Sequence, residues 1–369
     1  MLAVCRGIKM EQKKETLLEI HNLSVSFRMY DHGLEQTDLK VISDLHLTVR
    51  PGEIVAIAGS SGSGKSLLAS AVLGILPDNA TVKGHIHYKG QELTARQQEK
   101  LRGQKIALVP QSVAYLDPLM RVGAQVDGDI KPKPVDRRNR LFERFGLPQH
   151  TVKLYPFQLS GGMARRVLVS TALITEAELI IADEPTPGMS LEQALEALRM
   201  FRELADEGRA VILITHDIDL AFEFADRVAV FYAGTTVETA PAVDFKTGPE
   251  ALRHPYSKAL WRALPQNGFE PIPGFQPYAG NLPEGCLFAP RCPYRTQECV
   301  RQVPPVREIR GGEVLSCHLR RKIFILDMTE SSRGFWRTAV SGWIGESVLQ
   351  FLPRAVTARQ HLPCCYQVI

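Results

Sequence analysis

The stretch that decides the fold spans residues 59–66 and reads Gly59-Ser60-Ser61-Gly62-Ser63-Gly64-Lys65-Ser66. It fits the phosphate-loop pattern G-x-x-x-x-G-K-[ST] at every fixed position. The apolar, β-branched residues 53–58 predict a buried strand before it, and residues 67–76 predict a helix after it. Glycines let backbone N–H groups turn towards a polyphosphate, and a helix start adds unpaired N–H groups with partial positive charge. We therefore expect residues 59–66 to bind a nucleotide, with Lys65 at the β- and γ-phosphates and Ser66 on Mg²⁺.

Length and composition indicate a globular protein and exclude several other classes. The chain has 369 residues, 44% of them hydrophobic, which is ample for one large α/β domain with additions. Its 44 basic and 40 acidic residues give a formal charge of +4, too balanced to argue for nucleic acid as a partner. No uninterrupted apolar run of about 18 residues predicts a membrane span. Residues 1–14 lack the apolar core of a secretory signal, so we expect a cytoplasmic protein whose residues 1–15 form a tail, with Met10 as an alternative start.

Three further apolar segments predict strands that end in polar residues. They are residues 105–111, 179–184 and 211–216, which end in Gln111, in Asp183 and Glu184, and in His216. Ligands of open α/β sheets gather at the carboxyl ends of the strands, so we expect these side chains to lie near the phosphate loop.

Each of these polar residues has a predicted role. Asp183 fits the acidic partner of Mg²⁺, and Glu184 is placed to orient or deprotonate a water that attacks the γ-phosphate. A helix cap is the alternative for this carboxylate pair. Gln111 is a candidate to touch Mg²⁺ or the attacking water, and His216 can donate a hydrogen bond to the γ-phosphate.

A segment without the apolar pattern of a strand lies between the predicted strands at residues 105–111 and 179–184. Residues 113–158 predict a small helical insertion, and a helix over residues 164–175 follows it. Ser160 is a good N-cap for that helix, while Gly161 and Gly162 leave backbone N–H groups open to an anion. The chain therefore carries a second candidate phosphate-binding helix start.

An antiparallel sheet is predicted ahead of the phosphate loop. Residues 17–29 and 41–49 alternate apolar and polar side chains as strands do, and residues 30–40 predict the loop between them. Phe27 or Tyr30 could stack on an adenine ring, but core packing is the stronger reading of Phe27.

The order of these elements resembles that of the ATP-binding subunits of ABC transporters. It runs from the phosphate loop through Gln111, Leu159-Ser-Gly-Gly162 and the carboxylate pair to His216. The resemblance implies an α/β P-loop NTPase with a RecA-like core, an antiparallel β subdomain and a helical subdomain at about residues 113–165. It places this ABC ATPase domain at residues 16–250, with ATP and Mg²⁺ as cofactors. It also implies a head-to-tail dimer in which Ser160, Gly161 and Gly162 of one subunit complete the ATP site of the other.

The C-terminal part narrows the resemblance. The motifs His254-Pro-Tyr-Ser-Lys-Ala-Leu260, Leu282-Pro-Glu-Gly-Cys286 and Ala289-Pro-Arg-Cys292 look like the extension on ATPases of dipeptide, oligopeptide and nickel importers. This places a cysteine-rich extension at residues 251–320. Residues 109–120 look closest to the nickel-type members.

The resemblance implies ATP hydrolysis that energises uptake of short peptides or nickel, at the cytoplasmic face of the inner membrane. It implies a second, different ATPase subunit, two transmembrane permease subunits docked near residues 112–125, and an extracytoplasmic solute-binding protein. A soluble ABC ATPase of DNA repair or translation is the alternative, but it should show tandem cassettes or a long coiled coil, and the sequence shows neither. A metal-binding regulator with a relic nucleotide fold would need a broken phosphate loop or lack Glu184.

The chain has seven cysteines, and four of them fall late in the sequence. They are Cys286, Cys292, Cys299 and Cys317, whose spacing lacks the tight C-x₂-C pairs of a zinc ribbon. The resemblance implies that their thiolates hold a [4Fe-4S] cluster, with Zn²⁺ or buried thiols as alternatives. The odd count and a reducing compartment argue against a disulfide framework.

Two features depart from the family pattern. Ser190 stands where the family usually has an aspartate that crosses the dimer interface, so we expect weaker communication between the two ATP sites. Residues 321–369 match nothing in the family. Apolar side chains from Trp336 to Phe351 have helical spacing, which predicts an interfacial helix or a poorly ordered tail.

Overall fold

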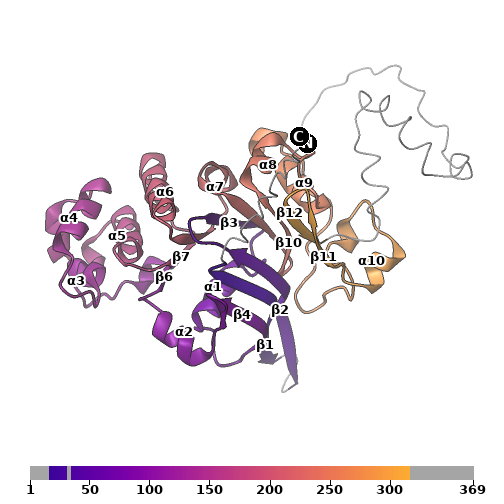
Figure 1. The fold of residues 1–369 in the computed structure, drawn as a ribbon, viewed down its shortest axis with the longest axis horizontal. Coiled ribbons are helices and arrows are strands. Elements are labelled where there is room, and N and C mark those ends of the chain that lie inside the picture. Colours follow the sequence, from indigo (N-terminus) through magenta and orange to yellow (C-terminus); the bar gives the residue numbers. More distant parts are fainter. Residues whose placement is uncertain (1–15, 31–34, 316–369) are drawn as a thin grey trace, which may run out of the picture. The chain divides into compact units, whose positions relative to one another are not determined.

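The computed structural model describes residues 16–30 and 35–315, which form two β-sheets with helices around them (Figure 1). The first sheet is antiparallel and has the order β2-β1-β4-β5. Its strands are β1 (Leu18–Tyr30), β2 (Gln36–Val49), β4 (Ala80–Tyr88) and β5 (Gln91–Glu92). The second sheet has the order β11-β12-β10-β9-β3-β8-β7-β6. Its strands are β3 (Ile54–Gly59), β6 (Ile106–Val109), β7 (Leu179–Asp183), β8 (Ala210–Ile214), β9 (Arg227–Tyr232), β10 (Thr235–Pro241), β11 (Val306–Ile309) and β12 (Gly312–Leu315).

The helices connect and cover these strands. They are α1 (Lys65–Leu73), α2 (Ala95–Leu101), α3 (Val122–Asp127), α4 (Val135–Arg144), α5 (Gly161–Leu173), α6 (Leu191–Asp206), α7 (Ile218–Phe224), α8 (Ala242–Thr247), α9 (Pro255–Arg262) and α10 (Gln297–Arg301). Several begin at the caps that their sequences provide. At the start of α6 the side chain of Ser190 accepts a hydrogen bond from the N–H of Gln193, and the Gln193 side chain accepts one from the N–H of Ser190. Thr94 and Gln97 form the same capping box at the start of α2.

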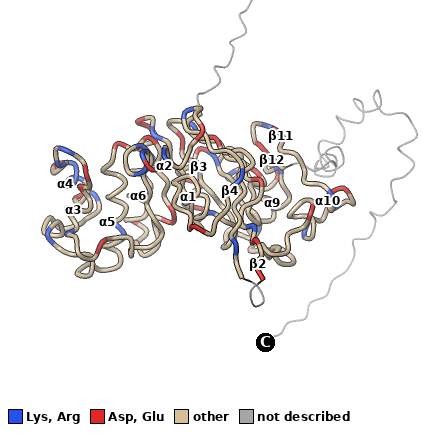
Figure 2. Tube along the Cα trace, turned by 90° about the horizontal axis from the view of Figure 1, so that it is seen from below, with Lys and Arg blue, Asp and Glu red and all other residues tan. Residues whose placement is uncertain are grey.

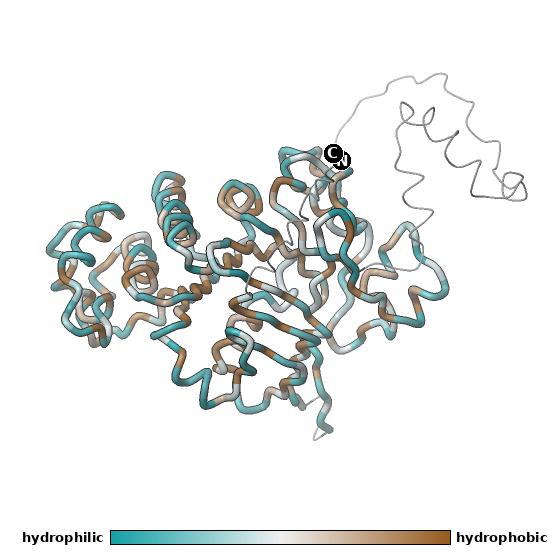
Figure 3. The backbone as a smooth tube through the Cα atoms, in the orientation of Figure 1, coloured by the Kyte–Doolittle hydropathy of each residue, from teal (hydrophilic) through white to brown (hydrophobic). Residues whose placement is uncertain are grey.

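The strands from β9 to β6 are parallel, and they are buried on both faces. Alternate residues of β3 point to opposite sides: Ile54 belongs to the hydrophobic cluster that includes Phe201 of α6, whereas Val55 belongs to the cluster that includes Leu68 of α1. The second cluster continues into the antiparallel sheet through Ile20. Figure 3 shows these central strands as hydrophobic stretches between more polar segments.

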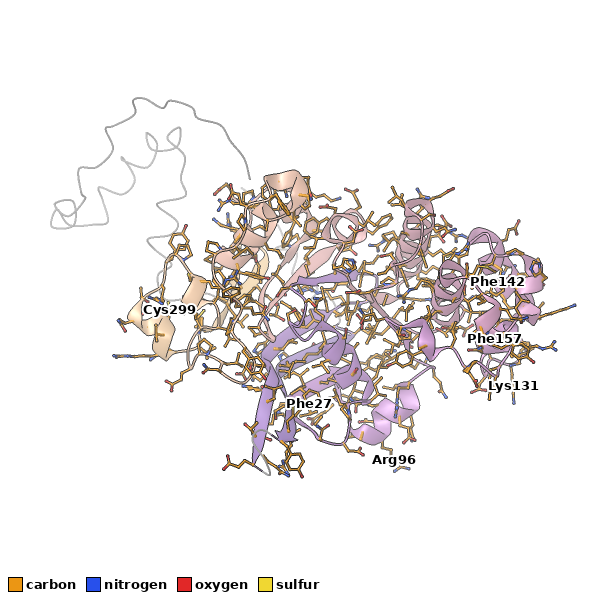
Figure 4. All side chains as sticks on the ribbon, turned by 180° about the vertical axis from the view of Figure 1, so that it is seen from behind. Phe27, Arg96, Lys131, Phe142, Phe157 and Cys299 are labelled. Carbon is orange, nitrogen blue, oxygen red and sulfur yellow. The ribbon has the colours of Figure 1, made fainter. Side chains whose placement is uncertain are left out.

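Helices α3, α4 and α5 form a helical region between β6 and β7, as the sequence predicted. Val122, Phe142 and Val167 pack together in its core, and Figure 4 labels Phe142 among these helices. Asp127 of α3 and Arg138 of α4 form a buried ion pair of 2.5 Å inside it. This pair orients α3 against α4 because both charges need each other away from water.

Two sequence predictions differ from the structure. The predicted loop at residues 30–40 was too long, since β2 already begins at Gln36 and pairs with Tyr30 of β1. Tyr30 and Gln36 are both exposed, yet the backbone hydrogen bonding between the strands continues to this pair. The alternation of apolar and polar residues therefore ends before the strands do. Strand β4 was not predicted for the same reason: its first six residues bury no side chain.

Charged residues of both signs are mixed along the backbone of the described elements. Figure 2 shows Lys and Arg interspersed with Asp and Glu over the described elements. None of the helices in the described part of the chain has the length and hydropathy needed to cross a membrane.

Strands β11 and β12 extend the central sheet, and Arg253 fastens them to it. The Arg253 side chain is only 4% exposed and pairs with Glu238 at 3.3 Å and Asp244 at 2.6 Å. It also donates to the carbonyl oxygens of Ile309 and Arg310 at the turn between β11 and β12. One guanidinium thus joins β10, α8 and the terminal hairpin.

We expect Arg253→Leu to lower the free energy of unfolding by about 3–5 kcal/mol, because it leaves the fully buried Glu238 carboxylate without its cation. Urea unfolding followed by circular dichroism measures this loss. Arg96→Leu is the matched control, since Arg96 is exposed on α2 and labelled in Figure 4. Equal midpoints for the two variants would contradict the role of Arg253.

Candidate functional site

The phosphate loop joins the end of β3 to the start of α1. A side chain at Gly59 would place its Cβ 2.4 Å from the carbonyl oxygen of Phe231, and Gly64 has φ 90°, so both positions require glycine. Gly64 caps α1 without a side chain, which leaves the first N–H groups of the helix open. The loop therefore has the form of an anion site at a helix start.

Lys65 folds back over the loop that precedes it. Its Nζ donates to the carbonyl oxygens of Gly59 and Ser60, both at 2.9 Å. Burial lowers the pKa of Lys65, and the nearby carboxylates of Glu184 and Asp183 act in the opposite direction. The ammonium group therefore lies inside the loop, within the field of both predicted acids.

Asp183 ends β7 beside the loop. Burial raises the pKa of its carboxyl group, against the effect of a hydrogen bond from Ser66. Its Oδ1 is buried and has no hydrogen-bond partner among the described residues. Hydroxyl and carboxylate oxygens are the hard ligands that Mg²⁺ prefers, so Ser66 and Asp183 fit the predicted metal.

Two other predicted site residues, Gln111 and His216, meet at Glu184. Gln111 Nε2 donates to Glu184 Oε2 at 3.2 Å, and His216 Nδ1 lies 3.3 Å from Glu184 Oε1. Glu184 has φ 47°, an uncommon conformation for this residue type, and its N–H donates to the carbonyl of Ile214 at 2.8 Å. The strands β6, β7 and β8 thus bring together residues that are 105 positions apart, from 111 to 216.

The second candidate anion site lies at the start of α5. Ser160 Oγ accepts from the N–H of Met163 at 3.3 Å, which is the predicted N-cap, and Ser160 and Gly161 are exposed. Helix α5 begins at Gly161, earlier than the predicted residue 164, because this cap acts before the two glycines. Within the described ranges, no hydrogen bond or ion pair joins residues 160–162 to the phosphate loop of the same chain.

One residue of this region was missed by the sequence reasoning. Arg165 donates to the carbonyl oxygens of Pro110 at 3.1 Å and Pro187 at 3.3 Å, and it feels the charges of Asp183 and Glu184. It connects the segment before Gln111 with the segment after the carboxylate pair. A single arginine inside a helix gives no sequence signal for such a role.

The aromatic candidates for adenine differ in exposure. Phe27 is half-buried and packs against the hydrophobic cluster under the antiparallel sheet, where Figure 4 labels it. Tyr30 is 65% exposed. The two readings of Phe27 therefore remain compatible, since its ring is partly covered and partly accessible.

The cysteines do not form a metal site in the described part of the chain. The N–H of Cys286 donates to the carbonyl of Cys299 at 2.8 Å, and Cys299 Sγ lies 3.2 Å from Thr296 Oγ1. Among residues 16–30 and 35–315, no three His, Cys, Asp or Glu side chains are arranged to hold a metal. Cys317 lies outside the described residues, as does the predicted helix between Trp336 and Phe351. The described residues therefore give no support to the predicted cluster.

Comparisons with known proteins agree with the fold and the loop. The ABC transporter family model matches residues 42–187, and the model of the oligopeptide/dipeptide transporter C-terminal region matches residues 237–299. The oligopeptide transport ATP-binding protein OppD of Salmonella typhimurium is 34% identical over 83% of this chain and 94% of its own length. The dipeptide transport ATP-binding protein DppD of Escherichia coli is 34% identical over 82% of this chain and 96% of its own.

A solved dimeric bacterial ABC transporter cassette, MJ0796, superposes with a TM-score of 0.54 and 25% identity, covering 61% of this chain and 99% of the cassette. The central sheet, the phosphate loop and the helical region are therefore those of an ABC ATPase. These comparisons confirm the resemblance, and the chain belongs to the ATP-binding subunits of ABC transporters of the oligopeptide and dipeptide type.

Proposed function

We propose that this chain hydrolyses ATP at the site around Glu184 and so energises the uptake of dipeptides or oligopeptides. The observation that carries the proposal is the meeting of Gln111 and His216 at Glu184, next to Lys65 and Asp183. The cargo is argued from the relatives, whose names assign them to oligopeptide and dipeptide transport. The nickel alternative has no support from these relatives.

Each side chain has a role in that reaction. Lys65 exchanges its carbonyl partners for phosphate oxygens, and residues 59–64 surround the phosphates with backbone N–H groups. Ser66 and Asp183 would hold Mg²⁺, which supplies positive charge to the phosphates when bound. Glu184 accepts the proton of the attacking water, Gln111 orients that water, and His216 donates to the γ-phosphate.

A second subunit completes the site. Ser160, Gly161 and Gly162 start helix α5, and within the described part of the chain no hydrogen bond joins them to their own phosphate loop, which favours a partner's ATP as the ligand of their N–H groups. We propose a head-to-tail pair with a second, different ATPase subunit. Ser190 already caps α6, so it is engaged locally where the family usually has an aspartate at the dimer interface.

We expect Glu184→Gln to retain ATP binding and to slow hydrolysis by about 10²–10⁴-fold, because the amide cannot accept the proton of the water. Phosphate release under saturating ATP and Mg²⁺ measures the rate, and gel filtration detects a trapped dimer. Glu192→Gln, an exposed change in the first turn of α6, serves as the control. Turnover at the wild-type rate would remove Glu184 from the mechanism.

The permease subunits need an apolar surface on this chain. Tyr115, Leu119 and Phe157 are 70%, 87% and 74% exposed, and we name these three residues the docking patch. Figure 4 labels Phe157 at the helical region. Arg121 lies over the ring of Tyr155, which stacks on Phe157, so the patch joins residues 112–125 to residues 155–157. Large exposed apolar side chains of this kind mark partner surfaces. Docking there would hold the chain at the cytoplasmic face of the membrane.

We expect Leu119→Asp to weaken binding of the permease by about tenfold or more, because an interface that buries an unpaired carboxylate loses several kcal/mol. The measurement is the amount of tagged permease that copurifies when all subunits are expressed together. Val300→Asp, at a 47% exposed position on α10, is the control. Equal recovery with both variants would show that the patch is not the docking surface.

The iron–sulfur cluster is a separate hypothesis that no step above uses. Four thiolates would be needed, and the fourth, Cys317, lies outside the described residues. If Cys286, Cys292, Cys299 and Cys317 hold a cluster, anaerobically purified protein will contain iron and absorb as a brown solution. Cys286→Ser should lose both properties and Cys5→Ser neither, whereas iron-free wild-type protein would refute the cluster.

A further inference from the structure

The segment after α9 touches the phosphate loop. Ser60 Oγ donates to Gln276 Oε1 at 2.5 Å, across 216 positions of sequence. Ser60 occupies a variable position of the phosphate-loop pattern, so the pattern does not account for this bond. The contact links the region that matches the transporter C-terminal model to the loop that matches the ATPase model.

Arg291 anchors the segment that leads to Gln276. Arg291 donates to the carbonyl oxygens of Ile272 at 2.8 Å and Pro273 at 2.7 Å, which fixes the segment leading to Gln276. The guanidinium of Arg291 also lies 5.9 Å from the ring centre of Tyr232, at the end of β9. The segment is therefore fastened to the central sheet.

Ser60 also contacts Tyr256, which belongs to a buried aromatic cluster with Tyr232 and Phe288. Tyr256 is only 2% exposed, and its ring centre lies 4.5 Å from that of Tyr232 and 5.5 Å from that of Phe288. Burial raises the pKa of Tyr256, while interactions of its hydroxyl with Ser60 act in the opposite direction. Ser60 is thus contacted by two residues of the C-terminal region, Tyr256 and Gln276.

Ser60 is also the residue whose carbonyl oxygen binds Lys65 at 2.9 Å. We propose that Gln276 is a positioning residue for ATP binding, which holds Ser60 and thereby presets the path of the phosphate loop around Lys65. The inference rests on the proposed role of residues 59–66 in binding ATP.

The expected effect follows from preorganisation. A loop already held in its binding conformation loses less conformational entropy when ATP binds. Loss of one hydrogen bond that maintains this conformation weakens binding by about three- to tenfold. Among the described residues no hydrogen bond or ion pair joins Gln276 to Glu184 or His216, so we expect the rate at saturating ATP to change by less than about twofold.

The experiment is a fluorescence titration of the full chain with mant-ATP and Mg²⁺, together with the steady-state KM and kcat for ATP. The variants are Gln276→Ala, Gln276→Met, Ser60→Ala and the double variant Ser60→Ala/Gln276→Ala. Gln276→Met preserves side-chain length but cannot accept the bond, so it separates the bond from packing. Gln302→Ala, at an exposed position at the end of α10, is the control, and thermal unfolding checks that each variant is folded.

The proposal expects Gln276→Ala and Gln276→Met to raise Kd and KM by three- to tenfold. It also expects the double variant to bind no more weakly than Ser60→Ala. Unchanged Kd in both Gln276 variants, or additive effects in the double variant, would overturn it while leaving the proposed function intact. Wild-type protein that binds no mant-ATP, or Lys65→Ala that binds as tightly, would overturn both.

Discussion

The parallel hydrogen bonding of β3, β8, β7 and β6 is the constraint on which the candidate site depends. Ile57 pairs with Ile214, Ile214 with Asp183, and Ala182 with Val109, so the four strands end at the same edge of the sheet. Gln111, Asp183, Glu184 and His216 lie at these ends or within two residues of them, and the phosphate loop begins where β3 ends. A shift of one residue in any pair would turn the side chain at that end to the other face and separate it from the phosphate loop. The hydrophobic packing on both faces, which fixes this register, therefore also fixes the chemistry.

Burial shifts the pKa values of the two charged groups at this sheet edge in opposite directions. It lowers the pKa of Lys65 and raises that of Asp183, so the sheet edge disfavours both ionised forms. The attraction between Lys65 and Asp183 partly offsets this effect for both groups, whereas Asp183 Oδ1 has no hydrogen-bond partner in the described part of the chain. Phosphate oxygens would stabilise the ammonium group and a divalent cation the carboxylate. A nucleotide bound with its metal would supply both stabilising charges, which gives the site a physical reason to bind the two together.

The sequence predicted the parts of this site that depend on local chemistry. Short runs of consecutive residues predict these parts. They are the phosphate loop, the strand ends at Gln111, Asp183 and His216, and the helix cap at Ser160. It could not predict strand β4 or the start of β2, where backbone pairing continues without apolar alternation. It also could not predict Arg165 or Gln276, whose partners are distant in sequence and whose residue types suit any surface.

The C-terminal region belongs to the same hydrophobic core as the ATPase strands. Phe288, Tyr256 and Tyr232 share one buried cluster with Ile54 and Val211 of the parallel sheet. Phe231, next to Tyr232, leaves no room for a Cβ at Gly59, so β9 limits the first residue of the phosphate loop from one side. Gln276 and Tyr256 limit the second residue, Ser60, from another. A displacement of the C-terminal region would therefore also change the phosphate loop, because side chains that pack in the C-terminal region contact the loop as well.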